Sequence, residues 1–158
     1  MKSLKILGIL GMIMFLNSFA FPTEMLDGDL NDEKTAVNWY NIEEVQSMAK
    51  EAPKDVFIDF TAKWCGWCKV MDKKTFSDQA VAKYINENYY AVKVDFDSEQ
   101  RFEFLGKEYD AKAFARKYNV TGLPTILFAS SDFETVVPVV GYQNAKQFMT
   151  KLKKFSNR

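Results

Sequence analysis

The chain has 158 residues, of which 47% are hydrophobic and 15% aromatic; this favours one globular domain with a substantial core and excludes a disordered chain. Its 21 basic residues balance its 21 acidic residues and form no long basic run. Nucleic acid and anionic membrane surfaces are therefore not expected partners.

The first twenty residues have the pattern of a secretory signal peptide. Two lysines precede an apolar run from Ile6 to Leu16, and the segment closes on Ser18-Phe19-Ala20, with small residues where a signal peptidase reads them. The run is shorter than the roughly 20 residues that a membrane-spanning helix needs, so cleavage is favoured over the alternative of an uncleaved N-terminal anchor. We expect residues 1–20 to direct export to a bacterial periplasm or to the outside of the cell. A flexible segment at 21–35 then leads into a domain at 36–158, which has no membrane attachment after cleavage.

The rest of the chain alternates between strand and helix patterns. Apolar and β-branched runs predict strands over 37–40, 56–61, 90–95, 125–129 and 135–140. Apolar residues at helical spacing predict helices from an Asn41 cap to before Pro53, from Cys68 to about Thr75, from a Ser77 cap onward, over 111–118, and from an Asn144 cap to Phe155. Residues 96–110 fit neither pattern, and Pro138 marks the last strand as an edge strand. The order β, α, β, α, β, α, β, β, α predicts an α/β fold in which helices flank both faces of a mixed central sheet.

The stretch WCGWC, residues 64–68, contains the only two cysteines of the chain, Cys65 and Cys68, and the chain has no histidine. A zinc site needs about four ligands, usually cysteine and histidine, so no metal is expected here. A structural staple is also disfavoured, because a disulfide that closes so short a loop removes little entropy from the unfolded chain. A redox-active pair is the favoured interpretation, and export to an oxidising compartment suits it.

The place of the pair between a strand and a helix gives each cysteine a role. Cys65 would lie at the helix N-terminus, where unsatisfied N–H groups and the helix dipole stabilise a thiolate. We therefore expect Cys65 to be the exposed, attacking thiol. Cys68, buried and one turn into the helix, would resolve a mixed disulfide formed at Cys65.

The segment FIDFTAKWCGWCK resembles the active-site segment of the thioredoxin superfamily, and TGLPT resembles its cis-proline loop. The resemblance runs from about Val37 to Phe155 and includes six features in order. These are Asp59 in the strand, Trp64 before the pair, Lys69 after it, Lys93 in the next strand, Pro124 after Gly122-Leu123, and Gly141 at the end of the last strand. The resemblance implies a thioredoxin fold with no cofactor other than the Cys65–Cys68 disulfide.

Two departures from thioredoxin point to other members of the superfamily. Trp67 replaces the proline between the cysteines, and the chain has an insertion within residues 97–120. Such an insertion before ARKYNVTGLPT is similar to secreted bacterial thioredoxin-like proteins of the SoxW type. The stretch KVMDKKTFSDQAVAKYIN is similar to the C-terminal domain of DsbD-type reductases.

Asp59 is an acid within an apolar strand, which is costly unless the acid has a partner or a task. Burial would raise the pKa of this carboxyl group. That suits proton transfer to and from Cys68, with Lys93 as a charge partner. The alternatives are a carboxylate at a strand end that faces water and, for Lys93, an ordinary exposed lysine.

The resemblance also implies a surface that binds a partner chain. If its peptide bond is cis, Pro124 brings the backbone of Leu123 beside the sulfurs, where an extended segment can pair by strand addition. Trp64, Gly66 and Trp67 would add contact surface next to the nucleophile. The alternatives are a trans proline that opens a strand and tryptophans that serve only in packing.

Together these features predict an exported thiol-disulfide oxidoreductase, a monomer that reduces disulfide-containing protein substrates. The reducing direction is preferred because no histidine stands between the cysteines to stabilise a strongly oxidising thiolate. A reductase in an oxidising compartment needs electrons from outside itself, and a DsbD-type membrane donor is expected to supply them. The alternatives are a disulfide oxidase or isomerase and a chaperone-like peptide-binding module in which the cysteines are secondary.

Overall fold

The computed structural model describes residues 35–158, so the predicted signal peptide and nearly all of the segment that follows it lie outside the described residues. The strands are β1 (Trp39–Tyr40), β2 (Asp55–Thr61), β3 (Tyr89–Asp95), β4 (Arg101–Phe104), β5 (Lys107–Asp110), β6 (Thr125–Ala129) and β7 (Val136–Val140). The helices are α1 (Ile42–Glu51), α2 (Gly66–Met71), the π-helical turn η1 (Asp72–Phe76), α3 (Gln79–Asn88), α4 (Ala111–Lys117) and α5 (Ala145–Ser156). The predicted order is confirmed, with β4 and β5 as additional strands.

Five strands form one mixed sheet in the order β1, β3, β2, β6, β7. The first three are parallel to one another, whereas β6 is antiparallel to β2 and to β7. The central strand β2 is buried from Val56 to Phe60, as its continuous apolar pattern predicts. The edge position of β7, which carries Pro138, is confirmed.

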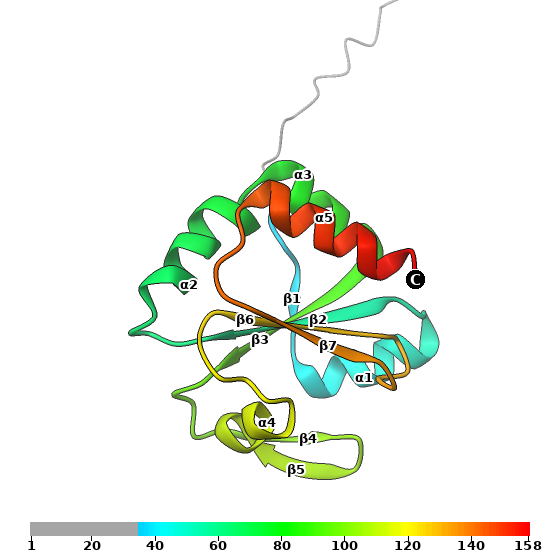
Figure 1. The fold of residues 1–158 in the computed structure, drawn as a ribbon. Helices are drawn as coiled ribbons and strands as arrows, with labels where there is room; N and C mark the ends of the chain where they lie inside the picture. The colour runs from blue at the N-terminus through cyan, green and yellow to red at the C-terminus, as the bar shows by residue number, and fades with distance from the viewer. Residues whose placement is uncertain (1–34) are drawn as a thin grey trace, which may run out of the picture. The chain divides into compact units, whose positions relative to one another are not determined.

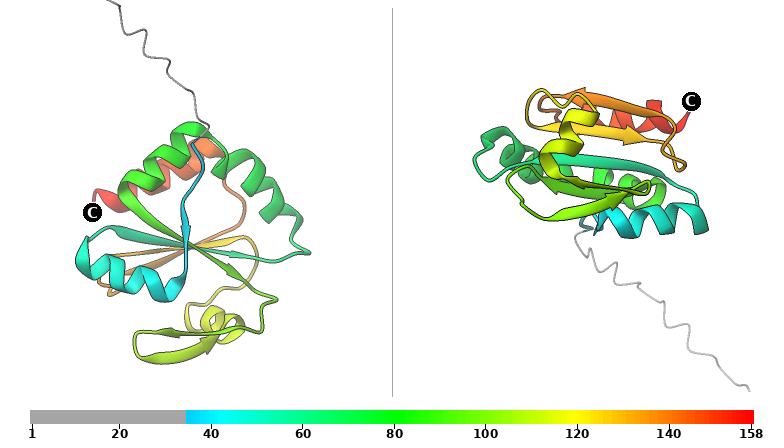
Figure 2. Two further views of the ribbon diagram at one scale, coloured as in Figure 1. Left: turned by 180° about the vertical axis from the view of Figure 1, so that it is seen from behind. Right: turned by 90° about the horizontal axis from the view of Figure 1, so that it is seen from below.

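Helices cover both faces of this sheet (Figures 1 and 2). On one face lie α2, α3 and α5, and on the other lie α1, α4 and the β4–β5 hairpin. Side chains of β2 alternate between the two cores: Ile58 and Phe60 pack toward α1 and α4, whereas Phe57 packs toward α3 and α5. Asp59 therefore shares the face of Phe57, which is the side that α2 covers.

Two helix starts differ from the sequence prediction. Helix α2 begins at Gly66 rather than Cys68, because the Cys65 side chain caps it. Helix α3 is capped by Asp78 rather than Ser77: the Asp78 carboxylate accepts the N–H of Val81, whereas the Ser77 hydroxyl donates back to a carbonyl of η1. Asn41 and Asn144 cap α1 and α5 as predicted. Within residues 35–158, every helix is too short or too polar to cross a membrane.

The unassigned stretch 96–110 contains a two-stranded hairpin that stands apart from the main sheet. Strands β4 and β5 pair in antiparallel register around Leu105 and Gly106, which both have positive φ angles, of 51° and 73°. Phe102 and Phe104 on β4 pack edge-on against Phe114 of α4. The hairpin is thus anchored to the domain through aromatic contacts.

Helix α1 holds the outer edge of β4 through two polar side chains. The Glu43 carboxylate accepts the N–H of Glu103 at 2.7 Å. The Gln46 amide donates to the carbonyl of Glu103 at 2.9 Å and accepts the N–H of Leu105 at 2.8 Å. Side chains of a helix here satisfy backbone groups that a neighbouring strand would otherwise satisfy.

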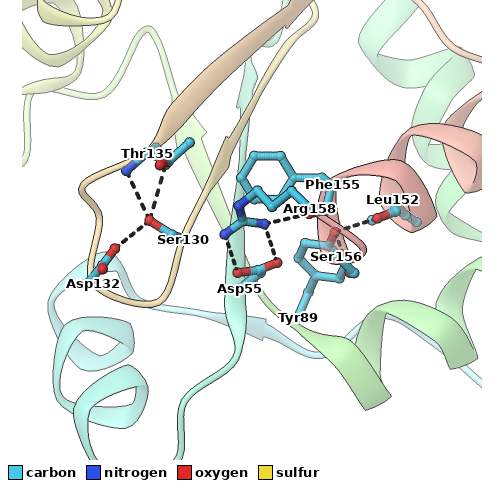
Figure 3. A network of polar contacts seen from close by, with 9 residues as sticks. All are labelled: Asp55, Tyr89, Ser130, Asp132, Thr135, Leu152, Phe155, Ser156 and Arg158. Carbon is cyan, nitrogen blue, oxygen red and sulfur yellow. Dashed lines mark hydrogen bonds and ion pairs between the residues drawn. The ribbon is translucent and has the colours of Figure 1, made fainter.

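A polar network joins the start of β2 to the end of α5 (Figure 3). The guanidinium of Arg158 donates two hydrogen bonds to the Asp55 carboxylate, at 2.8 and 2.9 Å. The Tyr89 hydroxyl donates to the carbonyl of Leu152 and accepts from Ser156. Burial raises the pKa of Tyr89 to about 12, so this hydroxyl remains a neutral donor at neutral pH.

Candidate active site

Cys65 and Cys68 form a disulfide at the turn between β2 and α2, with their Cα atoms 5.3 Å apart. Cys65 is the N-cap of α2, and its Sγ accepts the backbone N–H of Cys68 at 3.1 Å. The backbone N–H of Cys65 bonds to the carbonyl of Ala62 at 3.0 Å, which closes the turn after the strand. The predicted place of Cys65 at a helix N-terminus is therefore confirmed.

The expectation that Cys65 is exposed is wrong for this disulfide state. Cys65 is 4% exposed and Cys68 is 3% exposed. The two cysteines form a small apolar cluster with Ala62, against which Phe96 and Leu123 pack. Leu123 lies beside the cysteines, as the resemblance to the cis-proline loop implied, whereas Phe96 comes from a loop distant in sequence and was not predicted.

Asp59 is a buried and incompletely paired carboxyl group. Its exposed fraction is 2%, and its Oδ1 atom has no hydrogen-bond partner among the described residues. Burial raises the pKa of Asp59 to about 7, against the opposing effect of the nearby Lys93 ammonium. The alternative of a carboxylate facing water is excluded for this residue.

Lys93 lies opposite Asp59 in the parallel register of β2 and β3. Its Nζ is 3.9 Å from Oδ2 of Asp59 and 2.6 Å from Oδ1 of Asp72 in η1. It also lies 4.4 Å from the ring centroid of Trp39 in β1. The structure therefore brings Asp59 and Lys93 together as predicted, and it adds Asp72 and Trp39. The sequence prediction missed Asp72 because it stands next to two lysines in a polar stretch, as a solvent-facing acid would.

Trp64 is 66% exposed, and its indole N–H donates to the Asp97 carboxylate at 3.1 Å. Beside it lies a pocket of about 170 Å³, which Trp64 lines together with Phe96, Val120, Thr121, Gly122 and Leu123. Because Phe96 and Leu123 also cover the disulfide, this pocket adjoins the sulfurs. Its size suits a single side chain of a bound partner.

Trp67 is 62% exposed and lies against Tyr142, with ring centroids 5.3 Å apart and ring planes inclined by 37°. Tyr142 follows β7 and was not identified from the sequence, since one tyrosine in a polar loop shows no pattern. Gly66, between Cys65 and Trp67, has open space where a side chain would begin. Trp67 and Tyr142 therefore form an aromatic surface at the turn that carries the cysteine pair.

The loop before β6 supplies the remaining wall of the site. The peptide bond between Leu123 and Pro124 is cis. The carbonyl of Pro124 accepts the N–H of Gly141 at 2.8 Å, and the Thr125 hydroxyl donates to the carbonyl of Gly122 at 2.6 Å. These bonds fix the loop so that Leu123 packs on the cysteine cluster.

The carboxylates and sulfurs of this site do not amount to a metal centre. Across residues 35–158, no three histidine, cysteine, aspartate or glutamate side chains gather in a group that could hold a metal ion. The reactive group that the site presents is the disulfide. A disulfide at the strand-to-helix turn of this mixed sheet, beside a proline loop, defines a thioredoxin-fold protein whose chemistry is thiol–disulfide exchange.

Comparison with known proteins identifies the family. The sequence model of the thioredoxin-like domain family matches residues 42–156, so the chain belongs to this family. The thiol:disulfide interchange protein DsbD of Pectobacterium atrosepticum is 29% identical, over 99% of this chain and 26% of its own length. That of Vibrio vulnificus is 31% identical, over 74% of this chain and 19% of its own length. The chain therefore spans about a quarter, or less, of the length of these curated relatives.

Solved structures confirm the fold. DsbH oxidoreductase superposes with a TM-score of 0.64 at 19% identity, over 77% of this chain and 85% of its own. The oxidised C-terminal domain of Neisseria meningitidis DsbD superposes with a TM-score of 0.55 at 24% identity, over 70% of this chain and 89% of its own. The predicted thioredoxin fold and the predicted similarity to the DsbD C-terminal domain are confirmed.

Proposed function

We propose that this chain is an exported thiol-disulfide oxidoreductase that reduces disulfides of partner proteins in a periplasm or outside the cell. The observation that carries the proposal is the Cys65–Cys68 disulfide at the start of α2, the helix that follows the strand carrying the buried Asp59. A helix N-terminus stabilises the thiolate of the first cysteine. A carboxyl group that titrates near neutral pH suits transfer of the proton of the second cysteine.

The reaction begins from the reduced pair. The Cys65 thiolate attacks one sulfur of a partner's disulfide, forms a mixed disulfide with it, and releases the partner's other sulfur as a thiolate that takes up a proton. The Cys68 thiol then gives its proton to Asp59 and attacks Cys65 Sγ. This step forms the Cys65–Cys68 disulfide and releases the second partner sulfur, which is protonated in turn. Two electrons have then passed from the cysteine pair to the partner.

Asp59 and Lys93 have supporting roles in this scheme. Asp59 must be ionised when Cys68 loses its proton, and a pKa of about 7 makes both protonation states accessible at neutral pH. The Lys93 ammonium, 3.9 Å away, favours the ionised form of Asp59 and partly balances its negative charge in the core.

The partner chain would lie across the exposed aromatic surface around the disulfide. Trp64 and Trp67 offer apolar area on two sides, and the pocket between Trp64 and Leu123 takes one side chain. The backbone of Leu123, next to the cis Pro124, offers hydrogen bonds to an extended segment. Open space at Gly66 lets that segment approach the sulfurs.

The reducing direction and the electron donor are also part of the proposal. The similarity to DsbD proteins supports a place in thiol–disulfide interchange, and the absence of histidine between the cysteines disfavours a strong oxidant. A membrane protein of the DsbD type would return two electrons to the disulfide after each turnover. The physical requirement is a donor with a lower reduction potential than this pair.

The test is reduction of a disulfide substrate by the purified protein without residues 1–20. The wild-type protein is expected to reduce insulin when a dithiol reductant regenerates it, Cys65→Ser to be inactive, and Cys68→Ser to accumulate a mixed disulfide with the partner. Failure of the wild-type protein to reduce insulin faster than the reductant alone would overturn the proposal and leave the peptide-binding module as the better interpretation. A reduction potential near about −120 mV, the value of a strong oxidant, would overturn the reducing direction.

A further inference from the structure

The Lys93 ammonium of β3 lies among two carboxylates and an aromatic ring that come from three other elements. The nearest partner is Asp72 of η1 at 2.6 Å, and Asp59 of β2 is farther, at 3.9 Å. The ring of Trp39 in β1 lies 4.4 Å from Lys93 Nζ. Lys93 thus hydrogen-bonds to the partly exposed Asp72 and lies beyond hydrogen-bond distance of the buried Asp59.

The position of Lys93 is unexpected, because a buried carboxylate attracts an ammonium ion more strongly than an exposed one does. Asp59 lies in a low-dielectric core and has an oxygen without a hydrogen-bond partner among the described residues, so an ammonium ion in contact with it would gain more than at the surface. Lysine has a flexible stem that could reach an alternative partner. Something must therefore hold the ammonium at Asp72.

Trp39 and Asp72, which contact Lys93, are themselves held in place by neighbouring groups. Trp39 packs edge-on against Phe57 and Phe76, with centroid separations of 5.5 and 5.3 Å. Asp72 begins the π-helical turn and its backbone N–H bonds to the carbonyls of Cys68 and Lys69. Because Asp72 is one turn beyond Cys68 on the same helical segment, the restraint on Lys93 is attached to the cysteine helix.

We propose that Asp72 is a positioning residue that, with Trp39, holds the Lys93 ammonium away from direct contact with Asp59 and thereby controls when Asp59 takes up and releases its proton. The inference rests on the proposed role of Asp59 as the proton acceptor of Cys68. It adds a second acid, outside the expected set of functional residues, to the proton-transfer apparatus.

The charges that act on Asp59 give the direction of the effect. Within residues 35–158, these charges are Lys93, which lowers the pKa of Asp59, and Asp72, which raises it. Removing the Asp72 charge has two consequences of the same sign: a like charge disappears, and Lys93 becomes free to close on Asp59. Only the movement of Lys93 toward Asp59 requires Lys93. Removing Lys93 therefore separates the positioning role of Asp72 from its direct charge repulsion of Asp59.

The test is a double-mutant cycle of Asp72→Asn and Lys93→Met, read out as the pKa of the Asp59 carboxyl by ¹³C NMR of the oxidised protein. Asp72→Asn is expected to lower that pKa by about one pH unit, and Lys93→Met to raise it by a similar amount. In the Lys93→Met background, Asp72→Asn should then lower the pKa by less than half as much as in the wild type. Asp72→Glu keeps the charge and should keep the wild-type value.

The matched control is Glu87→Gln, which removes one negative charge from an exposed position on α3 and should leave the Asp59 titration unchanged. An equal shift for Asp72→Asn in both backgrounds would overturn the proposal, because Asp72 would then act by its charge alone. The absence of any shift would overturn it too.

The proton-transfer role of Asp59 is tested separately, by the pH profile of disulfide reduction. If Asp72 positions Lys93 and Asp59 is the proton acceptor, the profile moves with the NMR pKa in each variant. If the NMR cycle behaves as expected while the profile stays fixed, the positioning role stands and the acceptor role of Asp59 is wrong. Loss of activity in Cys65→Ser tests the disulfide chemistry independently of both.

Discussion

Two aspartates on one strand, Asp55 and Asp59, show how differently the same side chain is used at the two ends of β2. They lie on the same face, on either side of Phe57. Asp55 is partly exposed, and both of its oxygens accept hydrogen bonds from Arg158 (Figure 3). Asp59 is 2% exposed, has one oxygen without a partner among the described residues, and meets its nearest cation only at 3.9 Å.

The difference separates a structural carboxylate from one that suits chemistry. A fully paired acid near the surface gains modestly from its partner and serves to hold two segments together. A buried acid that is left partly unpaired lowers stability when it ionises, so its retention points to a task. Changes at the two ends of β2 should therefore differ in their effects on stability, on the rate of disulfide reduction and on ion pairing.

The largest expected difference is in the pH dependence of stability. The folded state raises the pKa of Asp59 from 3.8 to about 7, so between these values it retains a proton that the unfolded chain has released. Stability contributed by this group is therefore present at low pH and is lost as pH rises toward 7, by up to about 4 kcal/mol. Urea unfolding of the oxidised protein from pH 4 to pH 8 measures this loss.

The Asp59→Asn variant should remove this slope, and Asp55→Asn should keep it. Above pH 7, Asp59→Asn should also be more stable than the wild type, because an uncharged amide replaces a desolvated carboxylate. A wild-type protein whose stability rises from pH 4 to pH 7 relative to Asp59→Asn would contradict the assignment.

The next difference is in the rate of disulfide reduction. Asp59→Asn removes the proton acceptor of Cys68 and is expected to slow reduction roughly a hundredfold near neutral pH, at the lower end of the range for general acid–base catalysis. Asp55→Asn should leave the rate unchanged, since Asp55 lies at the opposite end of β2 from the cysteines. Stopped-flow measurement of insulin reduction compares the two variants, and equal rates would remove the distinction between the two acids.

The smallest expected effect is at the structural end. Arg158→Ala breaks the two-bond pair with Asp55 and the contact of the guanidinium with the Phe155 ring, 3.7 Å from its centroid. A cost of about 1 kcal/mol in the free energy of unfolding is expected, because the pair is partly exposed. Urea unfolding at pH 7 measures the cost, and disulfide reduction should be unaffected. A change in the reduction rate would mean that this end of β2 communicates with the cysteines.

Much of the fold and part of the site could be predicted from the sequence because the relevant patterns are local. The continuous run from Val56 to Phe60 identified the central strand, and the acid within it identified Asp59. The change from a strand pattern to a helix pattern around the cysteines placed Cys65 at a helix start. In each case the decisive neighbours are within a few residues along the chain.

What the sequence did not reveal depends on contacts between distant segments. Phe96 packs against the cysteine cluster, and Lys93 lies 2.6 Å from Asp72 and 4.4 Å from the Trp39 ring. No local pattern in the sequence links these residues. The hairpin at 101–110 did carry a pattern, with Phe102 and Phe104 alternating before Leu105-Gly106. A leucine is an unusual residue at positive φ, so the turn was not recognised.

The hydrogen bonds between α1 side chains and the β4 backbone affect how molecules of this protein can associate. An open strand edge is a template on which a strand of another molecule can add, and repeated addition leads to aggregates. The side chains of Glu43 and Gln46 occupy the polar groups of Glu103 and the N–H of Leu105 along that edge. A hairpin could therefore be added outside the main sheet without creating an edge at β4 on which fibrils could grow.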